Sequence, residues 1–179
     1  RAAGFHDFVA LVRHRAESVM KLLGDGSDLG ITVRYSHDLE RAIGRGGAIR
    51  NALENGSIPG DKNLLVHNPD DQIVNYSGVD TGSLPRVGQQ ASSFPRDIGL
   101  AHLEGKRRGH VATVVVVDGT AYPYTGMTIN EGVVQQVQMY PYVPIPTHIG
   151  VTVFAPDVYP YFSRLFDIEG PMDFESVLL

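Results

Sequence analysis

The feature that most constrains the fold is an alternation of short β-branched runs with amphipathic helical segments. Strand-type runs occupy residues 8–12, 31–36, 63–68, 110–119 and 148–154. Helical segments lie between or after them, at residues 13–26, 46–56, 95–106 and 156–166. Such alternation predicts βαβ units, a mostly parallel sheet and helices on both of its sides. The unbroken run "ATVVVV" is typical of a strand that is covered on both faces.

One segment breaks this alternation. Residues 122–147, "YPYTGMTINEGVVQQVQMYPYVPIPT", hold two short alternating runs around Asn130-Glu131-Gly132 and then a proline-rich extended stretch. The Asn-Glu-Gly sequence predicts a β-hairpin. We expect this antiparallel insertion to form a lid or a second wall facing a ligand. With no internal repeat, the sequence predicts one domain over residues 1–179.

Composition excludes several classes of function. The chain has 179 residues, 42% of them hydrophobic, and a net charge of −5. A compact domain of this size buries about 70% of its unfolded surface, and its acidity argues against nucleic-acid binding. No apolar run approaches the ~20 residues of a membrane span. The absence of cysteine fits a reducing, cytoplasmic setting.

Both ends of the sequence suggest that the natural protein is longer. The chain opens with Arg1 rather than methionine, and it closes with "DFESVLL", which reads as the start of an amphipathic helix. We therefore expect a domain that is truncated at both ends.

The stretch "NLLVHNPDDQIV" at residues 63–74 is the first candidate for a functional site. An apolar strand runs directly into His67, Asn68, Pro69, Asp70 and Asp71. In open α/β sheets, ligands bind at the carboxyl ends of the strands, so the two carboxylates lie where a site is expected. The alternative is that Asn68 and Asp70 shape a turn or cap a helix. Position alone leaves both interpretations open.

The order of several motifs resembles that of sugar-nucleotide pyrophosphorylases. These motifs are "LGDGSDLGITVRYS", a glycine-rich turn opening "AIRNAL", "LLVHNPDDQIV", "ATVVVV", "YTGM", "GVV" and "THIGVTVF", and the similarity covers residues 4–178. The resemblance implies a Rossmann-like, GT-A-type, three-layer α/β/α fold with a mostly parallel central sheet and an inserted antiparallel hairpin. It implies a cytoplasmic nucleotidyltransferase that joins a nucleoside triphosphate to a sugar 1-phosphate and releases pyrophosphate. Nucleic acid and membrane have no part in that reaction, and a homo-oligomer is compatible with it.

The resemblance also implies a metal site at the end of this strand. The family presents an aspartate from Asn-Gly-Asp to a catalytic magnesium ion, and Asn68-Pro69-Asp70 takes that place here. Asp70 would then be the catalytic metal ligand, Asp71 the second candidate, and Asn68 a nucleotide contact. Mg²⁺ prefers hard oxygen ligands, with substrate phosphates and water completing its octahedron.

A glycine-containing turn in the family contacts the nucleobase through its backbone. The matching residues here are Gly44, Arg45, Gly46 and Gly47, although the family often has threonine where Arg45 stands. Missing side chains permit close approach, and the helix start behind the turn favours an acceptor group. The alternative is a plain loop in which glycine caps the helix.

Four residues match the family's sugar contacts. Tyr124 and Gly126 fall in "YTGM", Tyr140 stands where the family's Glu-Lys-Pro has its lysine, and His148 precedes "IGVTVF". Tyr140 can donate a hydrogen bond but carries no charge. For His148 the alternative is a histidine held by a nearby backbone carbonyl.

Two departures from the family argue against simple catalysis. One is the uncharged Tyr140. The other is the family's triphosphate-binding loop, a glycine-rich loop with an arginine, which would lie before Arg1 and which Gly24-Asp25-Gly26 does not replace. Losing one preorganised contact to a transition state costs about 3–4 kcal/mol, so we expect this fragment alone to be inactive.

Other functions remain as alternatives. One is a catalytically silent domain of the same fold that binds a nucleotide sugar or assembles subunits. A glycosyltransferase ranks lower, because it would need a spaced Asp-x-Asp motif and Asp70 and Asp71 are adjacent. The histidines show no zinc-site spacing, and no serine stands in a Gly-x-Ser-x-Gly setting.

Overall fold

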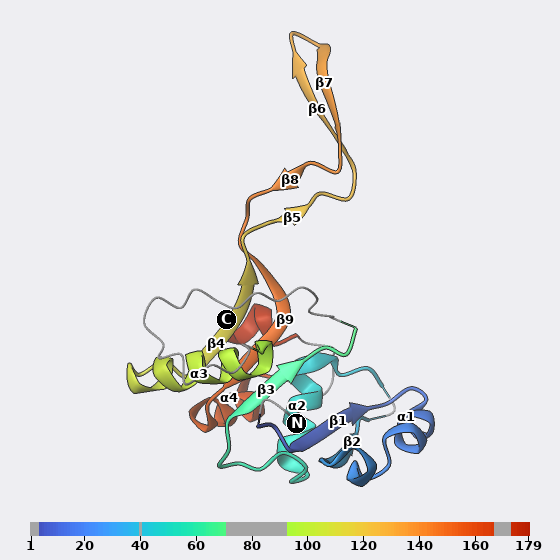
Figure 1. Cartoon of the computed structure of the whole chain (residues 1–179), viewed down its shortest axis with the longest axis vertical. Helices are drawn as coiled ribbons and strands as arrows, with labels where there is room; N and C mark the ends of the chain where they lie inside the picture. Colours follow the sequence, from blue (N-terminus) through green and yellow to red (C-terminus); the bar gives the residue numbers. More distant parts are fainter. Residues whose placement is uncertain (1–3, 40, 71–92, 167–172) are drawn as a thin grey trace.

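The computed structural model describes residues 4–39, 41–70, 93–166 and 173–179 (Figure 1). Asp71 therefore lies outside the described residues. The helices are α1 (Ala16–Leu23), α2 (Gly44–Glu54), α3 (Phe94–Arg107), α4 (Tyr159–Leu165) and α5 (Glu175–Leu178), with short 3₁₀ turns at Ser27–Leu29 and Pro156–Val158. The strands are β1 (Asp7–Val12), β2 (Thr32–His37), β3 (Leu64–His67), β4 (Ala112–Val117), β5 (Thr120–Ala121), β6 (Thr125–Asn130), β7 (Val133–Met139), β8 (Tyr142–Val143) and β9 (Thr147–Phe154).

The central sheet has the strand order β3-β9-β4, and β9 is antiparallel to both neighbours. Among the described strands, the only parallel pair is β1 with β2, which form a separate two-stranded sheet. The expected mostly parallel central sheet is thus not confirmed. The reason is that the chain leaves β4, makes its long excursion and returns as β9 alongside the strand it left. A chain that doubles back in this way pairs antiparallel.

The β1-β2 sheet lies beside the β3-β9-β4 sheet, although their described strands are not hydrogen-bonded to one another. An ion pair of 3.1 Å joins Lys62, just before β3, to Asp7 at the start of β1. The arrows of β1 and β3 point the same way in Figure 1. Val9 of β1 also packs against the same apolar core as Leu64 and Val66 of β3. The strands β1, β3 and β4 therefore run in one direction, with β9 opposed to them.

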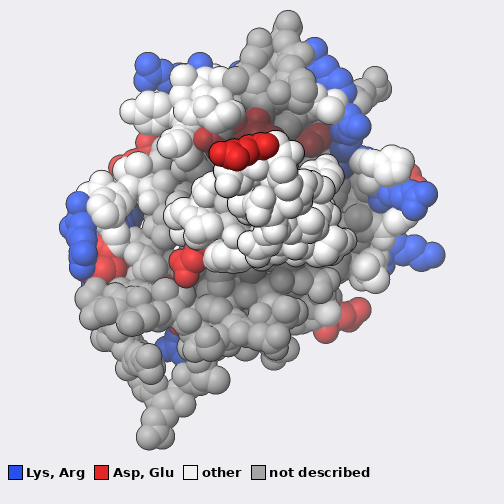
Figure 2. Space-filling model, turned by 90° about the horizontal axis from the view of Figure 1, so that it is seen from above, with Lys and Arg blue, Asp and Glu red and all other residues white. Residues whose placement is uncertain are grey.

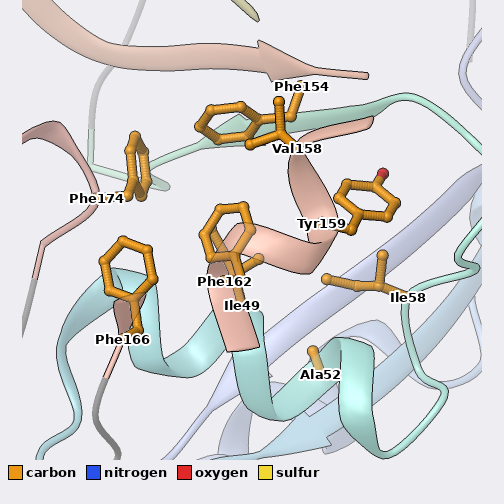
Figure 3. Close-up of a cluster of buried hydrophobic side chains, with 9 residues drawn as sticks. All are labelled: Ile49, Ala52, Ile58, Phe154, Val158, Tyr159, Phe162, Phe166 and Phe174. Carbon is orange, nitrogen blue, oxygen red and sulfur yellow. The ribbon is translucent and has the colours of Figure 1, made fainter. Parts of the chain in front are cut away.

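Apolar side chains cover both faces of the β3-β9-β4 sheet. On one face, Phe154 of β9 packs edge-to-face against Phe162 of α4 and Phe174, with ring centroids 5.5 and 5.3 Å apart (Figure 3). On the other face, Val151 and Val153 of β9 pack with residues of α3. Helices α2, α4 and α5 thus lie on one side and α3 on the other, which gives three layers at this sheet. Among the described residues, no helix is both long and apolar enough to cross a membrane.

The excursion between β4 and β9 forms a long projection, residues 119–146, which we call the arm (Figure 1). Its lower part is the pair β5–β8 and its outer part the hairpin β6–β7. The predicted hairpin is confirmed: Glu131 and Gly132 connect the strands with φ of +49° and +78°. Positive φ at both loop residues is what a two-residue type I′ turn requires.

Candidate functional site

The register of the sheet defines one edge where predicted site residues gather. His67, the last residue of β3, pairs with Val151, and Val117, the last residue of β4, pairs with Thr147. The carboxyl ends of β3 and β4 and the start of β9 therefore lie together. Asn68 and Asp70 continue from β3 at this edge, Asn68 half-buried and Asp70 exposed.

The four residues Gly44, Arg45, Gly46 and Gly47 form the first turn of α2. They do not make a separate turn before the helix. Gly44 has φ of +67°, a conformation that glycine adopts without strain. A Cβ on the buried Gly47 would lie 2.9 Å from Cβ of Ile43. Glycine is thus required here for close packing at the helix start, whatever else it contacts.

The side chain of Arg45 is bound by the C-terminal segment. Its Nη1 lies 2.8 Å from Oε1 of Glu175, and its Nε lies 3.1 Å from Oδ1 of Asp173. The guanidinium also lies over the ring of Phe174, 5.6 Å from its centroid. The side-chain hydrogen bond from Arg45 lowers the pKa of Asp173. These contacts bind the start of α2 to the end of the chain.

His148 belongs to the same cluster. Its Nε2 lies 3.2 Å from the carbonyl oxygen of Val151 and 3.0 Å from Oγ1 of Thr152. Its Nδ1 lies 3.6 Å from Oε1 of Glu175. A backbone carbonyl is thus within hydrogen-bonding distance of the ring, as the structural alternative for His148 required. Because Glu175 contacts both Arg45 and His148, the start of α2 lies at the same edge as the start of β9.

The other three predicted sugar contacts lie on the arm. Tyr124 and Tyr140 are 67% and 59% exposed. Gly126 lies against Pro141, where an added Cβ would come within 2.8 Å of Cγ. In Figure 1, β6 and β7 lie beyond β5 and β8, away from β3 and α2. The structure therefore brings Asn68, Asp70, residues 44–47 and His148 to one edge but leaves these three apart from it.

Sequence reasoning missed three acidic residues near this edge. Asp173 and Glu175 lie in a terminal segment whose packing no local pattern indicates. Asp38 follows β2 as Asp70 follows β3, so the same strand-end rule could have found it. Burial raises the pKa of Asp38, with a smaller opposing effect from the charge of Arg13.

The described residues contain no cluster of three or more histidine, aspartate or glutamate side chains able to hold a metal ion. Asp70 still fits a magnesium ion that takes most of its ligands from substrate. Its exposed carboxylate is a hard oxygen donor at a strand end. Mg²⁺ in phosphate-transfer sites commonly uses one or two carboxylates, with phosphate and water oxygens filling the remaining positions.

A cavity of about 370 Å³ lies elsewhere in the molecule. Phe5, Asn63 and Leu65 line it together with residues of α3, including His102, and none of the predicted site residues does. Nδ1 of His102 lies 3.1 Å from Oγ1 of Thr113. Burial lowers the pKa of His102, with a smaller effect from the charge of Lys106. Because Asn63 precedes β3, the cavity lies toward the opposite edge from Asp70.

No protein-family model matches the chain, and no curated protein matches its sequence. Solved structures do match its fold. HddC from Yersinia pseudotuberculosis aligns with a TM-score of 0.58 and 14% identity, over 99% of this chain and 66% of HddC. The same protein complexed with GMP-PN gives a TM-score of 0.56. A UDP-glucose pyrophosphorylase complexed with UDP-glucose gives 0.52 and 11% identity, over 98% of this chain and 69% of that one.

The chain therefore spans about two-thirds of the length of these structures. Identity this low shows a shared fold and nothing more. The chain has the α/β fold of these proteins.

Proposed function

We propose that this chain forms the nucleotide-sugar site of a magnesium-dependent nucleotidyltransferase. The reaction would join a nucleoside triphosphate and a sugar 1-phosphate to give a nucleotide sugar and pyrophosphate. One observation carries the proposal: Asp70 follows β3 at the edge where Glu175 joins the first turn of α2 to the start of β9. Proteins of the same fold hold GMP-PN and UDP-glucose.

In this proposal, the first turn of α2 and Asn68 position the nucleotide. The half-exposed Gly44 allows a base to approach the backbone, and the helix start favours groups with acceptor or negative character. Asp70, with Asp71 as a second candidate, would hold the magnesium ion. The bound ion supplies positive charge that neutralises the α-phosphate. The sugar phosphate oxygen then attacks the α-phosphorus in line, the bond to the β-phosphate breaks, and pyrophosphate leaves.

His148 is the proposed sugar contact at this edge, since its half-buried ring lies near the start of β9. Roles for Tyr124, Gly126 and Tyr140 at the sugar stay predictions, because the arm carries them away from β3 and α2.

A second function is a catalytically silent domain that binds a nucleotide sugar without turnover. The contacts of Arg45 and His148 favour it, because both side chains bind Glu175 of the chain itself. Tyr140 also offers no charge to a sugar phosphate where the similar family has a lysine. This alternative keeps the fold and the nucleotide site but not the chemistry.

The test is pyrophosphate release by the protein at its natural length, with a panel of nucleoside triphosphates and sugar 1-phosphates and with Mg²⁺. We expect Asp70→Asn to lower the rate by about 100- to 1,000-fold, because the loss of one electrostatic contact to the transition state costs about 3–4 kcal/mol. The control is Asp61→Asn, an exposed aspartate before β3 at the opposite edge. An unchanged rate in Asp70→Asn would show that Asp70 does not hold the metal.

Calorimetry separates the two functions. Titration with UDP-glucose and Mg²⁺ measures binding directly, and pyrophosphate is assayed in the same protein. Binding without pyrophosphate release from any substrate pair supports the silent domain. If the protein neither binds UDP-glucose nor releases pyrophosphate, both functions are contradicted.

A further inference from the structure

The arm exposes an unusual amount of apolar surface. Eleven of its large side chains are between 46% and 67% exposed: Tyr122, Tyr124, Met127, Ile129, Val133, Val134, Val137, Met139, Tyr140, Tyr142 and Ile145. Single exposed apolar residues are normal, but a contiguous patch on a soluble protein marks an interaction site or an aggregation hazard. This surface is therefore a candidate interaction site.

The pairing of β6 with β7 sorts the hairpin into two faces. Met127 pairs with Val137, Ile129 with Val134, and Thr125 with Met139. Neighbouring pairs between them are polar or small: Gly126 with Gln138 and Thr128 with Gln136. Because successive side chains of a strand point to opposite faces, one face is apolar. The other is polar or small except for Val133, which pairs with Asn130 beside the turn.

A register shift between Thr128 and Ile129 preserves this separation. Without it, Ile129 would stand opposite Gln135. With it, Val134 takes that place, so the apolar face continues toward the tip of the hairpin. A bulge that re-aims side chains in this way is a designed feature of a strand pair.

The arm also lacks charge. From Gly119 to Pro146 the sequence has one acidic or basic residue, Glu131, which lies in the turn at the tip. Figure 2 looks down on this end of the molecule and shows a broad white surface with few charged atoms. Across the whole chain, 20% of residues are charged. A surface so depleted in charge resembles the core of an interface rather than a solvated loop.

Close packing gives the arm a defined shape. A Cβ on Gly119 would overlap the carbonyl oxygen of Val143, and one on Gly126 would meet Pro141. The rings of Tyr122 and Tyr124 pack edge-to-face, 5.4 Å between centroids. The two sides of the arm thus pack against each other.

We propose that the apolar face of the β6–β7 hairpin binds the same face of a second copy of this chain. A face without charge can meet itself with no like-charge repulsion, which suits the symmetric interface of a twofold dimer. The eleven exposed side chains of the whole arm together offer on the order of 1,000 Å², with about 150–250 Å² for a complete aromatic side chain as the upper scale, and a stable interface takes about 800 Å² from each partner. Five of the eleven lie on the apolar face of the hairpin, so a dimer of that size would extend from this face onto the lower part of the arm. This inference does not depend on the proposed catalytic function.

Sedimentation equilibrium tests the proposal. The wild-type chain is expected to have twice its 19.5 kDa mass. Val137→Lys places a charge at the centre of the apolar face, and we expect it to raise the dimer dissociation constant by about 100-fold or more, since like charges facing each other cost several kcal/mol. The matched control is Gln138→Lys, the next residue on the polar face, which should change the constant by less than about twofold. Both positions are exposed, and circular dichroism verifies that both variants fold.

Three results would overturn the proposal. The first is a wild-type chain that stays at 19.5 kDa at high concentration. The second is equal weakening of the dimer by the two lysine variants. The third comes from spin labelling, which is simple because the chain has no cysteine. A nitroxide at Glu131→Cys should give one defined distance between labels, and that distance should vanish in the Val137→Lys background. Persistence of the distance in that background would place the interface elsewhere.

Discussion

The side chain of Arg45 connects segments that are far apart in the sequence. It contacts Asp173 and Glu175 near the end of the chain, and Glu175 in turn contacts His148 in β9. Both carboxylate oxygens of Glu175 are shielded from solvent. A shielded carboxylate is costly unless a cation balances it. Arg45 therefore has a structural role at the start of α2.

Replacing Arg45 by alanine should lower the free energy of unfolding by about 1–3 kcal/mol at neutral pH, since the shielded carboxylate of Glu175 loses the cation that pairs with it. Urea unfolding measures this. Arg107→Ala is the control, because Arg107 makes an exposed ion pair with Glu104 on the surface of α3. Exposed pairs of that kind contribute at most about 1 kcal/mol. Equal effects of the two substitutions would contradict the structural role of Arg45.

Part of the Arg45 effect should depend on pH. The hydrogen bond from Arg45 lowers the pKa of Asp173 from its usual 3.8. The carboxylate is therefore easier to protonate in the unfolded chain than in the folded one. Its stabilising contribution is present above pH 3.8 and is lost as the pH falls through the folded pKa. The difference in stability between wild type and Arg45→Ala should narrow over that acidic range, by a small amount because Asp173 is half-exposed.

At the scale of elements, β9 organises the domain. It pairs with β3 on one side and β4 on the other, and its alternate residues supply both cores. Phe154 is fully buried and packs against Phe162 and Phe174. The largest apolar core of the described residues is therefore centred on the end of this strand (Figure 3).

Phe154→Ala should lower the free energy of unfolding by about 3–5 kcal/mol, through lost apolar burial and the cavity that remains. The control is Phe8→Ala in β1, whose side chain is 40% exposed and should cost much less. Chemical denaturation of both variants is the measurement. A small effect of Phe154→Ala would mean that the packing around β9 is looser than described.

Local patterns predicted most of these elements. The strand predicted at residues 110–119, the helix predicted at residues 95–106 and the hairpin predicted at Asn130-Glu131-Gly132 agree with β4, α3 and the β6–β7 turn. Each depends on local chemistry: β-branched residues, helical periodicity, or a turn that demands positive φ. The direction of a strand does not depend on local chemistry. The apolar run at residues 148–154 predicts a strand equally well whether β9 is parallel or antiparallel to its neighbours.

At the scale of the whole molecule, the arm accounts for two features that local sequence patterns did not predict. It reverses the chain between β4 and β9, which makes the central sheet antiparallel. It also carries Tyr124, Gly126 and Tyr140 away from the edge that holds Asp70. Strand-end placement of Asn68 and Asp70 was predictable, because it follows from where an apolar run stops. The contacts of Arg45 with Asp173 and Glu175 were not, because they join residues more than a hundred positions apart.

The most direct test of the proposed site is to map a bound divalent ion by NMR. Mn²⁺ takes the same oxygen ligands as Mg²⁺ and broadens the signals of nearby amides. In the presence of a nucleotide sugar, we expect the amides of Asn68, Asp70 and Gly46 to broaden first, and Asp70→Asn to remove the effect. Broadening centred instead on Phe5 and His102, beside the cavity, would contradict a metal site at the end of β3.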